Sequence, residues 1–193
     1  MLTIDGFRAA LARYVALEVP ITEGMRQAAV AAVLCEHAGS LDLLFIHRAE
    51  DPRDPWSGHM AFPGGRVDPG DADPLGAAIR EAREEVSLDL EALAQKLGRL
   101  DDVQAIGRGR PMSLVISPFV FSLAERSVLV PNHEVAEVVW VPVEFLADQK
   151  NRETMEYRHS GLDLELPCYR YRDHLIWGMT LGMVDELLSL VAF

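Results

Sequence analysis

Three glutamates are predicted to lie close together on one face of a helix: Glu81, Glu84 and Glu85. The helix is expected over residues 74–87, because Asp73 is a favourable N-cap and Pro74 suits the first helical position. At about 100° per residue, the glutamates fall within about a quarter turn of one another, opposite an inward-facing apolar stripe. That stripe consists of Leu75, Ile79, Ala82 and Val86. Like charges three or four positions apart destabilise a helix by about 0.2–0.5 kcal/mol per pair, so this arrangement needs a cause.

Two interpretations fit the three glutamates. One is a solvated acidic surface, and the other is a site for hard divalent cations, which prefer carboxylate oxygens and neutralise clustered charge. The sequence before the helix favours the cation site. Gly64 and Gly65 allow the backbone to come close to a ligand and present its carbonyls, and the loop over 66–73 adds further acidic residues. A plain surface helix requires neither feature.

The segment from Gly65 to Leu88 resembles the Nudix box, usually written G-x5-E-x7-R-E-U-x-E-E-x-G-U, and matches its Arg-Glu-x-x-Glu-Glu core. It departs from the box in three ways. The loop after Gly65 is one residue longer, Asp71 occupies the position of the first glutamate, and Ser87 replaces a glycine. The resemblance implies the α/β class, as a Nudix-like α/β/α sandwich with a mixed β-sheet and an additional N-terminal helix.

The same resemblance implies roles for the acidic face. Glu81 and Glu85 are expected to bind Mg2+ or Mn2+, and Glu84 is expected to share a metal or to polarise water. Arg80 would orient a carboxylate, and the carbonyl of Gly65 would complete the coordination.

Residues 43–48 and 58–65 resemble the extra motif of the coenzyme A pyrophosphatase branch, roughly L-L-T-x-R-S-x4-R-x3-G-x3-F-P-G-G. Ala49 stands at the serine, and Asp54 stands at the second arginine, with Arg53 one residue early. The resemblance implies that coenzyme A or acyl-CoA is cleaved to 3′,5′-ADP and (acyl-)4′-phosphopantetheine. The alternatives are another nucleoside diphosphate derivative (ADP-ribose, a dinucleoside polyphosphate, an NTP or capped RNA) and a non-catalytic ligand sensor.

Hydrolysis of a phosphoanhydride requires an activated water and neutralised phosphate charge, and metal ions can supply both. Glu84 is the first choice for activating the water, because it shares the helix face with the expected metal ligands; Glu134, before a predicted strand, is the second. Phe62 is a candidate for stacking on an adenine, with core packing as the alternative. Four arginines are candidate phosphate contacts, with surface charge balance as the alternative for each: Arg48, Arg66, Arg108 and Arg110.

The pattern along the chain predicts a mixed sheet flanked by helices. Apolar residues at helical spacing predict an amphipathic helix over 2–17. Strands at 28–35 and 41–47 are expected to form a hairpin, and 49–58 is expected to be a loop. Four more strands, the last two of them weaker, and a final helix complete the prediction: 113–123, 135–141, 155–159, 162–176, and the helix from about Trp177.

The composition limits the partners. A chain of 193 residues suits one compact domain, which we divide into an N-terminal helical extension over 1–24 and a Nudix hydrolase domain over 25–193. The net charge of −12 disfavours a stable nucleic-acid partner. No apolar run approaches the roughly 20 residues that span a bilayer, so we expect no membrane partner and a cytoplasmic location. Cys35 and Cys168 are expected to be ordinary thiols. The expected partner is a small-molecule nucleotide diphosphate, and a homodimer is compatible with the sequence.

Overall fold

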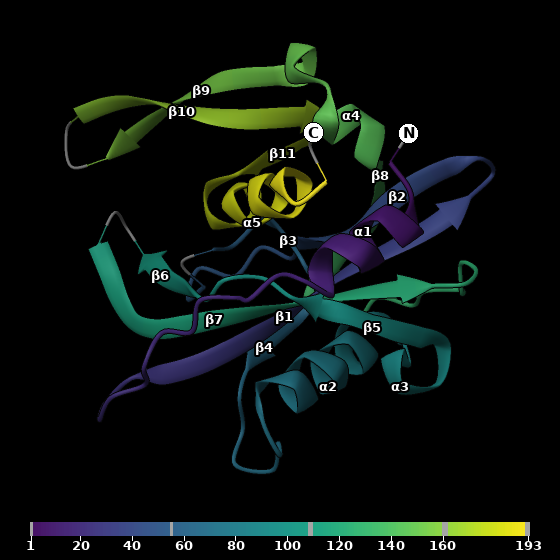
Figure 1. Cartoon of the computed structure of the whole chain (residues 1–193). Coiled ribbons are helices and arrows are strands. Elements are labelled where there is room, and N and C mark those ends of the chain that lie inside the picture. The colour runs from purple at the N-terminus through teal and green to yellow at the C-terminus, as the bar shows by residue number, and fades with distance from the viewer. Residues whose placement is uncertain (1, 55, 108–109, 160–161, 192–193) are drawn as a thin grey trace.

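A mixed β-sheet forms the middle layer of the molecule (Figure 1). The computed structural model describes residues 2–54, 56–107, 110–159 and 162–191. Within them the central sheet has eight strands: β1 (Arg26–His37), β2 (Ser40–Arg48), β3 (Met60–Ala61), β4 (Gly64–Arg66), β5 (Ala94–Arg99), β6 (Val103–Gly107), β7 (Arg110–Leu123) and β8 (Val135–Pro142). Their order is β3-β2-β1-β7-β5, with β4, β6 and β8 pairing with β1, β7 and β2. The β1–β7 pair is parallel, and the hairpin neighbours β1 and β2 are antiparallel.

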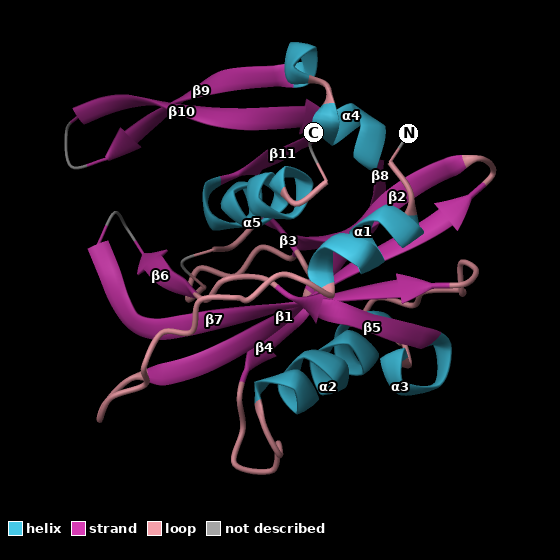
Figure 2. Cartoon of the chain, viewed as in Figure 1, coloured by secondary structure: helices cyan, strands magenta, loops and turns pink. Residues whose placement is uncertain are grey.

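Helices cover both faces of this sheet (Figure 2). They are α1 (Ile4–Leu11), α2 (Pro74–Val86), α3 (Leu90–Leu93), α4 (Val143–Ala147) and α5 (Gly178–Ser189), with a 3-10 turn at Gln149–Asn151. In the view of Figure 2, α2 and α3 lie on one side of the central sheet, whereas α1 and α5 lie on the other. The sandwich of three layers agrees with the fold expected from the sequence.

Two apolar cores separate the layers. Successive residues of a strand point to opposite faces, and β2 shows this alternation. Phe45 belongs to the same buried cluster as Phe7 of α1 and Leu181 of α5, whereas its neighbour Leu44 belongs to the cluster that contains Ala82 of α2. Because Phe7 is fully buried, α1 is part of the main core and does not stand apart from it.

A second, three-stranded sheet lies beyond α5: β9 (Arg152–His159), β10 (Leu162–Tyr171) and β11 (His174–Trp177). The single strand expected over 162–176 is therefore two strands. Tyr171 pairs with His174, and Arg172 in the turn between them has a positive φ of 54°. Cys168 on β10 and Cys35 on β1 are both fully buried.

Several predicted elements are confirmed. The hairpin of β1 and β2 pairs His37 with Ser40 across its turn, and the helix expected over 74–87 is α2. The strands expected at 113–123 and 135–141 correspond to β7 and β8, and the last helix begins at Gly178. The short elements α3, α4, β5 and β6 were not predicted, because their apolar residues are too few to show a period.

The N-terminal helix is shorter than predicted, since α1 covers only Ile4–Leu11 of the expected 2–17. Hydrogen bonds to a neighbouring loop draw the following residues into an extended path. The N–H of Leu17 donates to the Asp101 carboxylate at 2.8 Å, and the Leu17 carbonyl accepts from the N–H of Asp102 at 2.9 Å. Tertiary contacts therefore outweigh the helical spacing beyond Leu11.

No helix among the described residues combines the length and the apolar composition that crossing a bilayer requires.

Candidate active site

The ends of α2 follow the local sequence. The side chain of Asp73 accepts a hydrogen bond from the N–H of Gly76 at 2.8 Å, as an N-cap does. Ser87 lies at the C-cap in the left-handed conformation, with φ 58°, and its N–H bonds carbonyls of the last helical turn. This is the position where helices favour glycine. The replacement of glycine by Ser87 therefore leaves the turn after the helix intact.

The three glutamates of α2 differ in exposure, which corrects the prediction of one common outer face. Glu85 is only 2% exposed, whereas the Glu84 side chain is 55% exposed. The buried face of α2 includes three alanines and Glu85, and Leu75 and Ile79 are only partly buried. Alanine has a short side chain, so the helix packs closely on β1 and is turned so that Glu85 faces inward. The predicted stripe is right for Ala82 and Val86, which are fully buried, but Ala77, Ala78 and Glu85 complete the buried face in place of Leu75 and Ile79.

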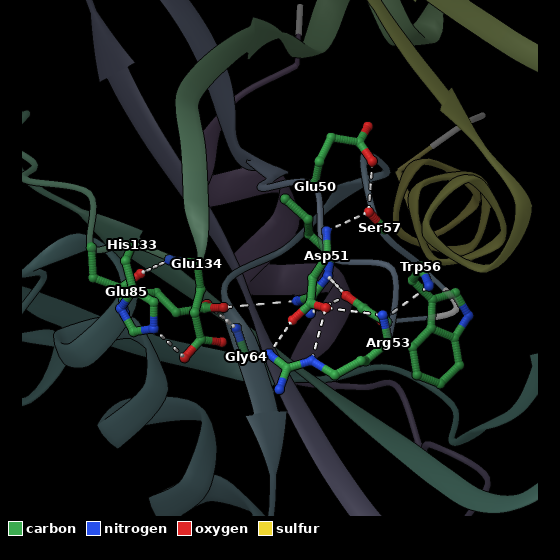
Figure 3. A network of polar contacts seen from close by, with 12 residues as sticks. Glu50, Asp51, Arg53, Trp56, Ser57, Gly64, Glu85, His133 and Glu134 are labelled. Carbon is green, nitrogen blue, oxygen red and sulfur yellow. Dashed lines mark hydrogen bonds and ion pairs between the residues drawn. The ribbon is translucent and has the colours of Figure 1, made fainter.

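Glu85 joins α2 to the glycine loop. Its carboxylate accepts a hydrogen bond from the backbone N–H of Gly64 at 2.8 Å, and Figure 3 shows the two residues side by side. A guanidinium nitrogen of Arg48 lies 3.9 Å from the other carboxylate oxygen. The buried carboxylate therefore has one close hydrogen bond and one distant positive charge, which is sparse compensation for a group removed from water.

Both glycines of the loop are required by close contacts. A Cβ on Gly64 would lie 2.2 Å from the backbone carbonyl oxygen of Ala29, and its φ of 155° is one that other residues rarely adopt. A Cβ on Gly65 would lie 2.3 Å from a carboxylate oxygen of Glu81. Gly64 thus allows β4 to pair with β1, and Gly65 leaves room for the carboxylate of Glu81.

Arg80 connects the acidic groups around α2. Its guanidinium donates two hydrogen bonds of 3.0 Å to the two oxygens of Asp71, and one of 2.9 Å to the carbonyl of Arg66. The remaining nitrogen donates to Glu81 at 3.0 Å and to Glu84 at 3.1 Å. Paired hydrogen bonds to one carboxylate fix a guanidinium plane. Asp71 therefore orients Arg80, and Arg80 orients the two glutamates.

Burial perturbs the acidic groups. It raises the pKa of Glu85 to about 8, although the Gly64 N–H and the charge of Arg48 act in the opposite direction. Burial also raises the pKa of Glu81, against the hydrogen bond from Arg80. The negative charge of Glu134 contributes to both increases, so it lies within electrostatic range of both groups. The pKa of Asp71 is lowered by its hydrogen bonds from Arg80.

This donor set fits a hard divalent cation. Buried carboxylates whose pKa values are raised have too little compensating charge, and a cation bound between them would supply it. Within the ranges described above, no three acidic, histidine or cysteine side chains already converge on one point, because Arg80 draws Glu81 and Glu84 toward itself. Carboxylates at the ends of rotatable side chains can exchange such a partner for a metal.

Arg48 lies beside this site on β2. Two of its nitrogens donate to one carboxylate oxygen of Asp54, at 2.9 and 2.6 Å, and the third faces Glu85. The side chains of Arg48 and Asp54 are only 23% and 17% exposed. Of the candidate phosphate contacts that the structure describes, Arg48 is the one in direct electrostatic contact with the acidic site.

Glu134 lies at the end of the loop that precedes β8. Its backbone carbonyl accepts a hydrogen bond from the N–H of Ala49 at 2.8 Å, and its N–H donates to the Asn132 side chain at 2.8 Å. Figure 3 places Glu134 beside Glu85 and Gly64. The structure therefore brings the second candidate base to the same place as the acidic helix, although the two are about fifty positions apart in the sequence.

The other predicted binding residues are placed differently. Phe62 is 1% exposed and packs against Phe45 with ring centroids 5.1 Å apart, so its position is that of a core residue and not of a surface for an adenine. Arg66 has an exposed side chain at the end of β4. Arg108 lies outside the described residues, and for Arg110, the first residue of β7, only the backbone is described.

Sequence reasoning missed two acidic residues of the site. Asp71 was noted only as a replacement for the first glutamate of the box, yet it is the bidentate partner of Arg80. Asp54 was noted only as a missing arginine, yet it is the partner of Arg48. In each case the sequence has an acid at a position where the family motif has a different residue. That departure could have indicated a new ion pair, and the structure shows that each acid pairs with an arginine.

A three-layer α/β fold with an acidic helix behind a Gly-Gly loop is the arrangement of a Nudix hydrolase. A model of the NUDIX domain matches residues 25–160, and the chain belongs to the Nudix family. Members of this family are pyrophosphohydrolases that generally use divalent metal ions such as Mg2+ or Mn2+.

Individual relatives agree with this assignment. The chain is 32% identical over 162 residues to the mouse (Mus musculus) protein "Peroxisomal coenzyme A diphosphatase NUDT7". The matched region covers 78% of this chain but only 64% of the mouse protein. It is 32% identical over 193 residues to "Uncharacterized Nudix hydrolase NudL" of Enterobacter sp. (strain 638), covering 96% of this chain and 93% of the relative. A MutT/nudix family protein from Enterococcus faecalis has the same fold, with a TM-score of 0.60 at 18% identity over 99% of this chain and 75% of that one.

Proposed function

We propose that this chain is a divalent-metal-dependent pyrophosphohydrolase that cleaves the diphosphate of coenzyme A or acyl-CoA. Water adds to one phosphorus of the diphosphate and the bridging P–O bond breaks, so the products are 3′,5′-ADP and (acyl-)4′-phosphopantetheine. The observation that carries the proposal is Glu85, a carboxylate 2% exposed whose closest partner is a backbone N–H of the glycine loop. A buried acid in this setting fits a metal ligand better than a structural ion pair.

The choice of coenzyme A rests on similarity. The residues before Gly65 resemble the extra motif of the coenzyme A pyrophosphatase branch, and the mouse relative carries the name of a coenzyme A diphosphatase. Asp54 in place of the second arginine is a departure within that motif. ADP-ribose, dinucleoside polyphosphates, nucleoside triphosphates and capped RNA are the other substrates to be compared.

The proposal assigns the metal to Glu81 and Glu85, with Glu84 sharing it and the Gly65 carbonyl completing the set. A bound Mg2+ or Mn2+ would lower the pKa of a water and neutralise phosphate oxygens. Arg80 keeps the glutamates of α2 in place through its bonds to Asp71 and to the two glutamates themselves. Without a metal these hydrogen bonds hold Glu81 and Glu84 at Arg80, and a bound cation would replace them at the two carboxylates.

The proton of the attacking water needs a base within reach. Glu84 is the first assignment, because its side chain is 55% exposed and lies on the same helix as the proposed ligands. Glu134 is the second, because its side chain is 54% exposed and its charge acts on Glu81 and Glu85. Arg48 and Arg66 are the proposed phosphate contacts, since guanidinium groups bind phosphate oxygens in pairs.

A substrate panel tests the function directly. Purified protein with Mg2+ or Mn2+ is incubated with coenzyme A, acetyl-CoA, ADP-ribose, diadenosine tetraphosphate and a nucleoside triphosphate, and the products are identified by mass. The expected result is that coenzyme A or its acyl derivative has the highest kcat/KM and releases 3′,5′-ADP. Cleavage of ADP-ribose or diadenosine tetraphosphate without turnover of coenzyme A would reject this substrate and retain the hydrolase.

Two substitutions separate the candidate bases. Glu84→Gln and Glu134→Gln each remove one charge, and the base is the residue whose loss lowers kcat by about 10²–10⁴-fold when the metal ion is saturating for each variant. Glu91→Gln is the matched control, because Glu91 is an exposed acid of α3 that pairs with Arg83 away from the site. If neither glutamate matters more than Glu91, the assignment of the base is wrong. A protein that only binds its ligand would be indifferent to all three substitutions.

A further inference from the structure

The loop between β2 and β3 is held by its own side chains (Figure 3). The hydroxyl of Ser57 donates to the Glu50 carboxylate at 2.8 Å and accepts from the N–H of Asp51 at 2.8 Å. The carboxylate of Asp51 in turn accepts from the backbone N–H of Arg53 at 2.9 Å and from its guanidinium. A Cβ on Gly58, where φ is 70°, would lie 2.4 Å from an oxygen of Glu50, so the loop closes tightly at this end.

Asp54 has both carboxylate oxygens occupied within this loop. One oxygen accepts a hydrogen bond from the backbone N–H of Trp56 at 3.0 Å. The other oxygen accepts from two nitrogens of Arg48, at 2.9 and 2.6 Å. A carboxylate with hydrogen bonds at both oxygens cannot rotate freely. The loop backbone, through the Trp56 N–H, therefore sets the direction in which Asp54 holds Arg48.

Arg48 consequently lies between two acids with different roles. Two of its nitrogens point to Asp54, and its third nitrogen lies 3.9 Å from a carboxylate oxygen of Glu85. Its backbone N–H is also fixed, because it donates to the carbonyl of His59 at 3.0 Å. The third nitrogen is too far from Glu85 for a hydrogen bond, and it faces the carboxylate beside which the proposed function locates the metal and the diphosphate.

We propose that Asp54 is a positioning residue that holds the guanidinium of Arg48 toward the substrate diphosphate. The inference rests on the proposed function in that it requires a diphosphate beside Glu85, but it does not depend on coenzyme A as the substrate. An arginine held in this way loses less side-chain freedom when it binds phosphate, which strengthens binding. The motif that this segment resembles has an arginine at the position of Asp54, and here an acid at that position pairs with Arg48.

Binding of an analogue that is not hydrolysed tests this inference without turnover. Isothermal titration with α,β-methylene-ADP and Mg2+ is carried out on wild type, Asp54→Asn, Arg48→Ala and the double variant. An asparagine can still accept from the Trp56 N–H with its Oδ1, but the Nδ2 that then faces Arg48 is a donor and cannot accept from the guanidinium. We expect Asp54→Asn to weaken binding by about tenfold, and to change it by less than about twofold when Arg48 is already alanine.

Matched variants exclude a general effect on the loop. Asp51→Asn also removes a charge from this loop, but Asp51 pairs with Arg53, so binding should stay within about twofold of wild type. Asp54→Glu restores the charge one methylene further out and should recover part of the loss. The thermal midpoint of each variant shows whether the loop remains folded, and Asp54→Ser, whose hydroxyl still accepts from Trp56, replaces Asp54→Asn if the latter does not fold.

Two results would overturn the inference. Tighter binding by Asp54→Asn would mean that Asp54 competes with the diphosphate for Arg48. An equal loss in the presence and absence of the Arg48 side chain would mean that Asp54 acts through the loop alone. Failure of the wild type to hydrolyse coenzyme A is a separate result, which affects the proposed substrate but not this binding cycle.

Discussion

The backbone N–H of Gly64 donates a hydrogen bond of 2.8 Å to the carboxylate of Glu85, although the two residues are 21 positions apart. This contact joins the glycine loop to the inner face of α2. It places a carboxylate that is 2% exposed against backbone that only glycine can form at that point. The acidic helix and the loop are therefore one unit, and a change in either should affect the other.

Replacing Glu85 by glutamine should stabilise the metal-free protein and abolish activity. The pKa of Glu85 is raised to about 8 from an ordinary value of 4.5, so between these pH values the folded state binds more protons than the unfolded state. The contribution of Glu85 to the free energy of unfolding is therefore fully present below about pH 4.5, and it is lost as the pH rises through about 8. At pH 8 and with EDTA, Glu85→Gln should raise the free energy of unfolding by about 1–3 kcal/mol. Urea denaturation at several pH values measures this.

The glutamine can still accept the hydrogen bond from Gly64, so a large loss of stability would contradict the view that the charge is the unfavourable element. Glu91→Gln is the control, because it also removes one carboxylate and its side chain is 68% exposed and pairs with Arg83 away from the site. Loss of kcat/KM by orders of magnitude in Glu85→Gln but not in Glu91→Gln completes the comparison.

Alanine at the two neighbouring glycines should have different effects. At Gly64 the new Cβ meets the backbone of β1 at 2.2 Å, which cannot move without separating β4 from β1. We expect Gly64→Ala to destabilise the fold by about 3 kcal/mol or more. At Gly65 the Cβ meets the end of the flexible Glu81 side chain, so Gly65→Ala should cost less than about 1.5 kcal/mol and instead lower activity. Thermal melts and kcat/KM are measured for both variants. Equal melting temperatures would contradict the expectation that Gly64→Ala destabilises the fold more than Gly65→Ala.

The part of the site that could be predicted from the sequence is the part encoded locally. Asp73 and Pro74 mark the start of α2, and the spacing of its glutamates is visible in one segment. The burial of Glu85 was not predictable in this way, because it depends on how closely the alanines of α2 pack on the sheet. The pattern of apolar residues gives the period of a helix but not the direction from which a neighbouring strand approaches.

Contacts between distant segments were beyond the sequence pattern. The parallel pairing of β1 with β7 aligns Arg26 with Leu114, and nothing in either strand specifies that partner. The support of Arg48 by Asp54 depends on the folded loop, in which backbone N–H groups fix the carboxylate. Side chains that act through such loops are recognised only once the backbone is known.

Removal of the Arg80 guanidinium should weaken both the site and the fold. Asp71, Glu81 and Glu84 would lose their shared cation and repel one another. Because Arg80 is partly buried, with 27% of its side chain exposed, we expect Arg80→Ala to lower the free energy of unfolding by about 2 kcal/mol. The control is Arg83→Ala, since Arg83 pairs with Asp89 and Glu91 at the exposed surface, and its loss should destabilise the protein less than the loss of Arg80. An equal decrease in the free energy of unfolding in the two variants would show that the hydrogen bonds of Arg80 stabilise the protein no more than those of a surface arginine.

Divalent metal should stabilise the protein through Glu81 and Glu85. A ligand that binds only the folded state, present at a hundredfold over its dissociation constant, adds about 2.7 kcal/mol. For a domain of this size, that corresponds to a rise of about 5–10 °C in the melting temperature. Mn2+ should produce this rise in wild type and in Glu91→Gln, but not in Glu81→Gln or Glu85→Gln. An unchanged response in the last two variants would place the metal elsewhere.

The burial of Glu186 beside Tyr14 should give a second pH dependence, away from the active site. Its hydroxyl oxygen lies 2.7 Å from an oxygen of Asp101 and 3.0 Å from one of Glu186, but a hydroxyl has one proton to donate. Burial raises the pKa of Glu186, although hydrogen bonds from Asp101 and Tyr14 act against this, so its contribution to stability is lost as the pH rises from its ordinary value upward. Glu186→Gln should therefore show a shallower fall in the free energy of unfolding than wild type as the pH rises above about 4.5. Glu144→Gln, which removes one exposed acid of α4, is the control. Urea denaturation at several pH values measures the slopes, and identical slopes for Glu186→Gln and wild type would contradict a raised pKa of Glu186 in the folded protein.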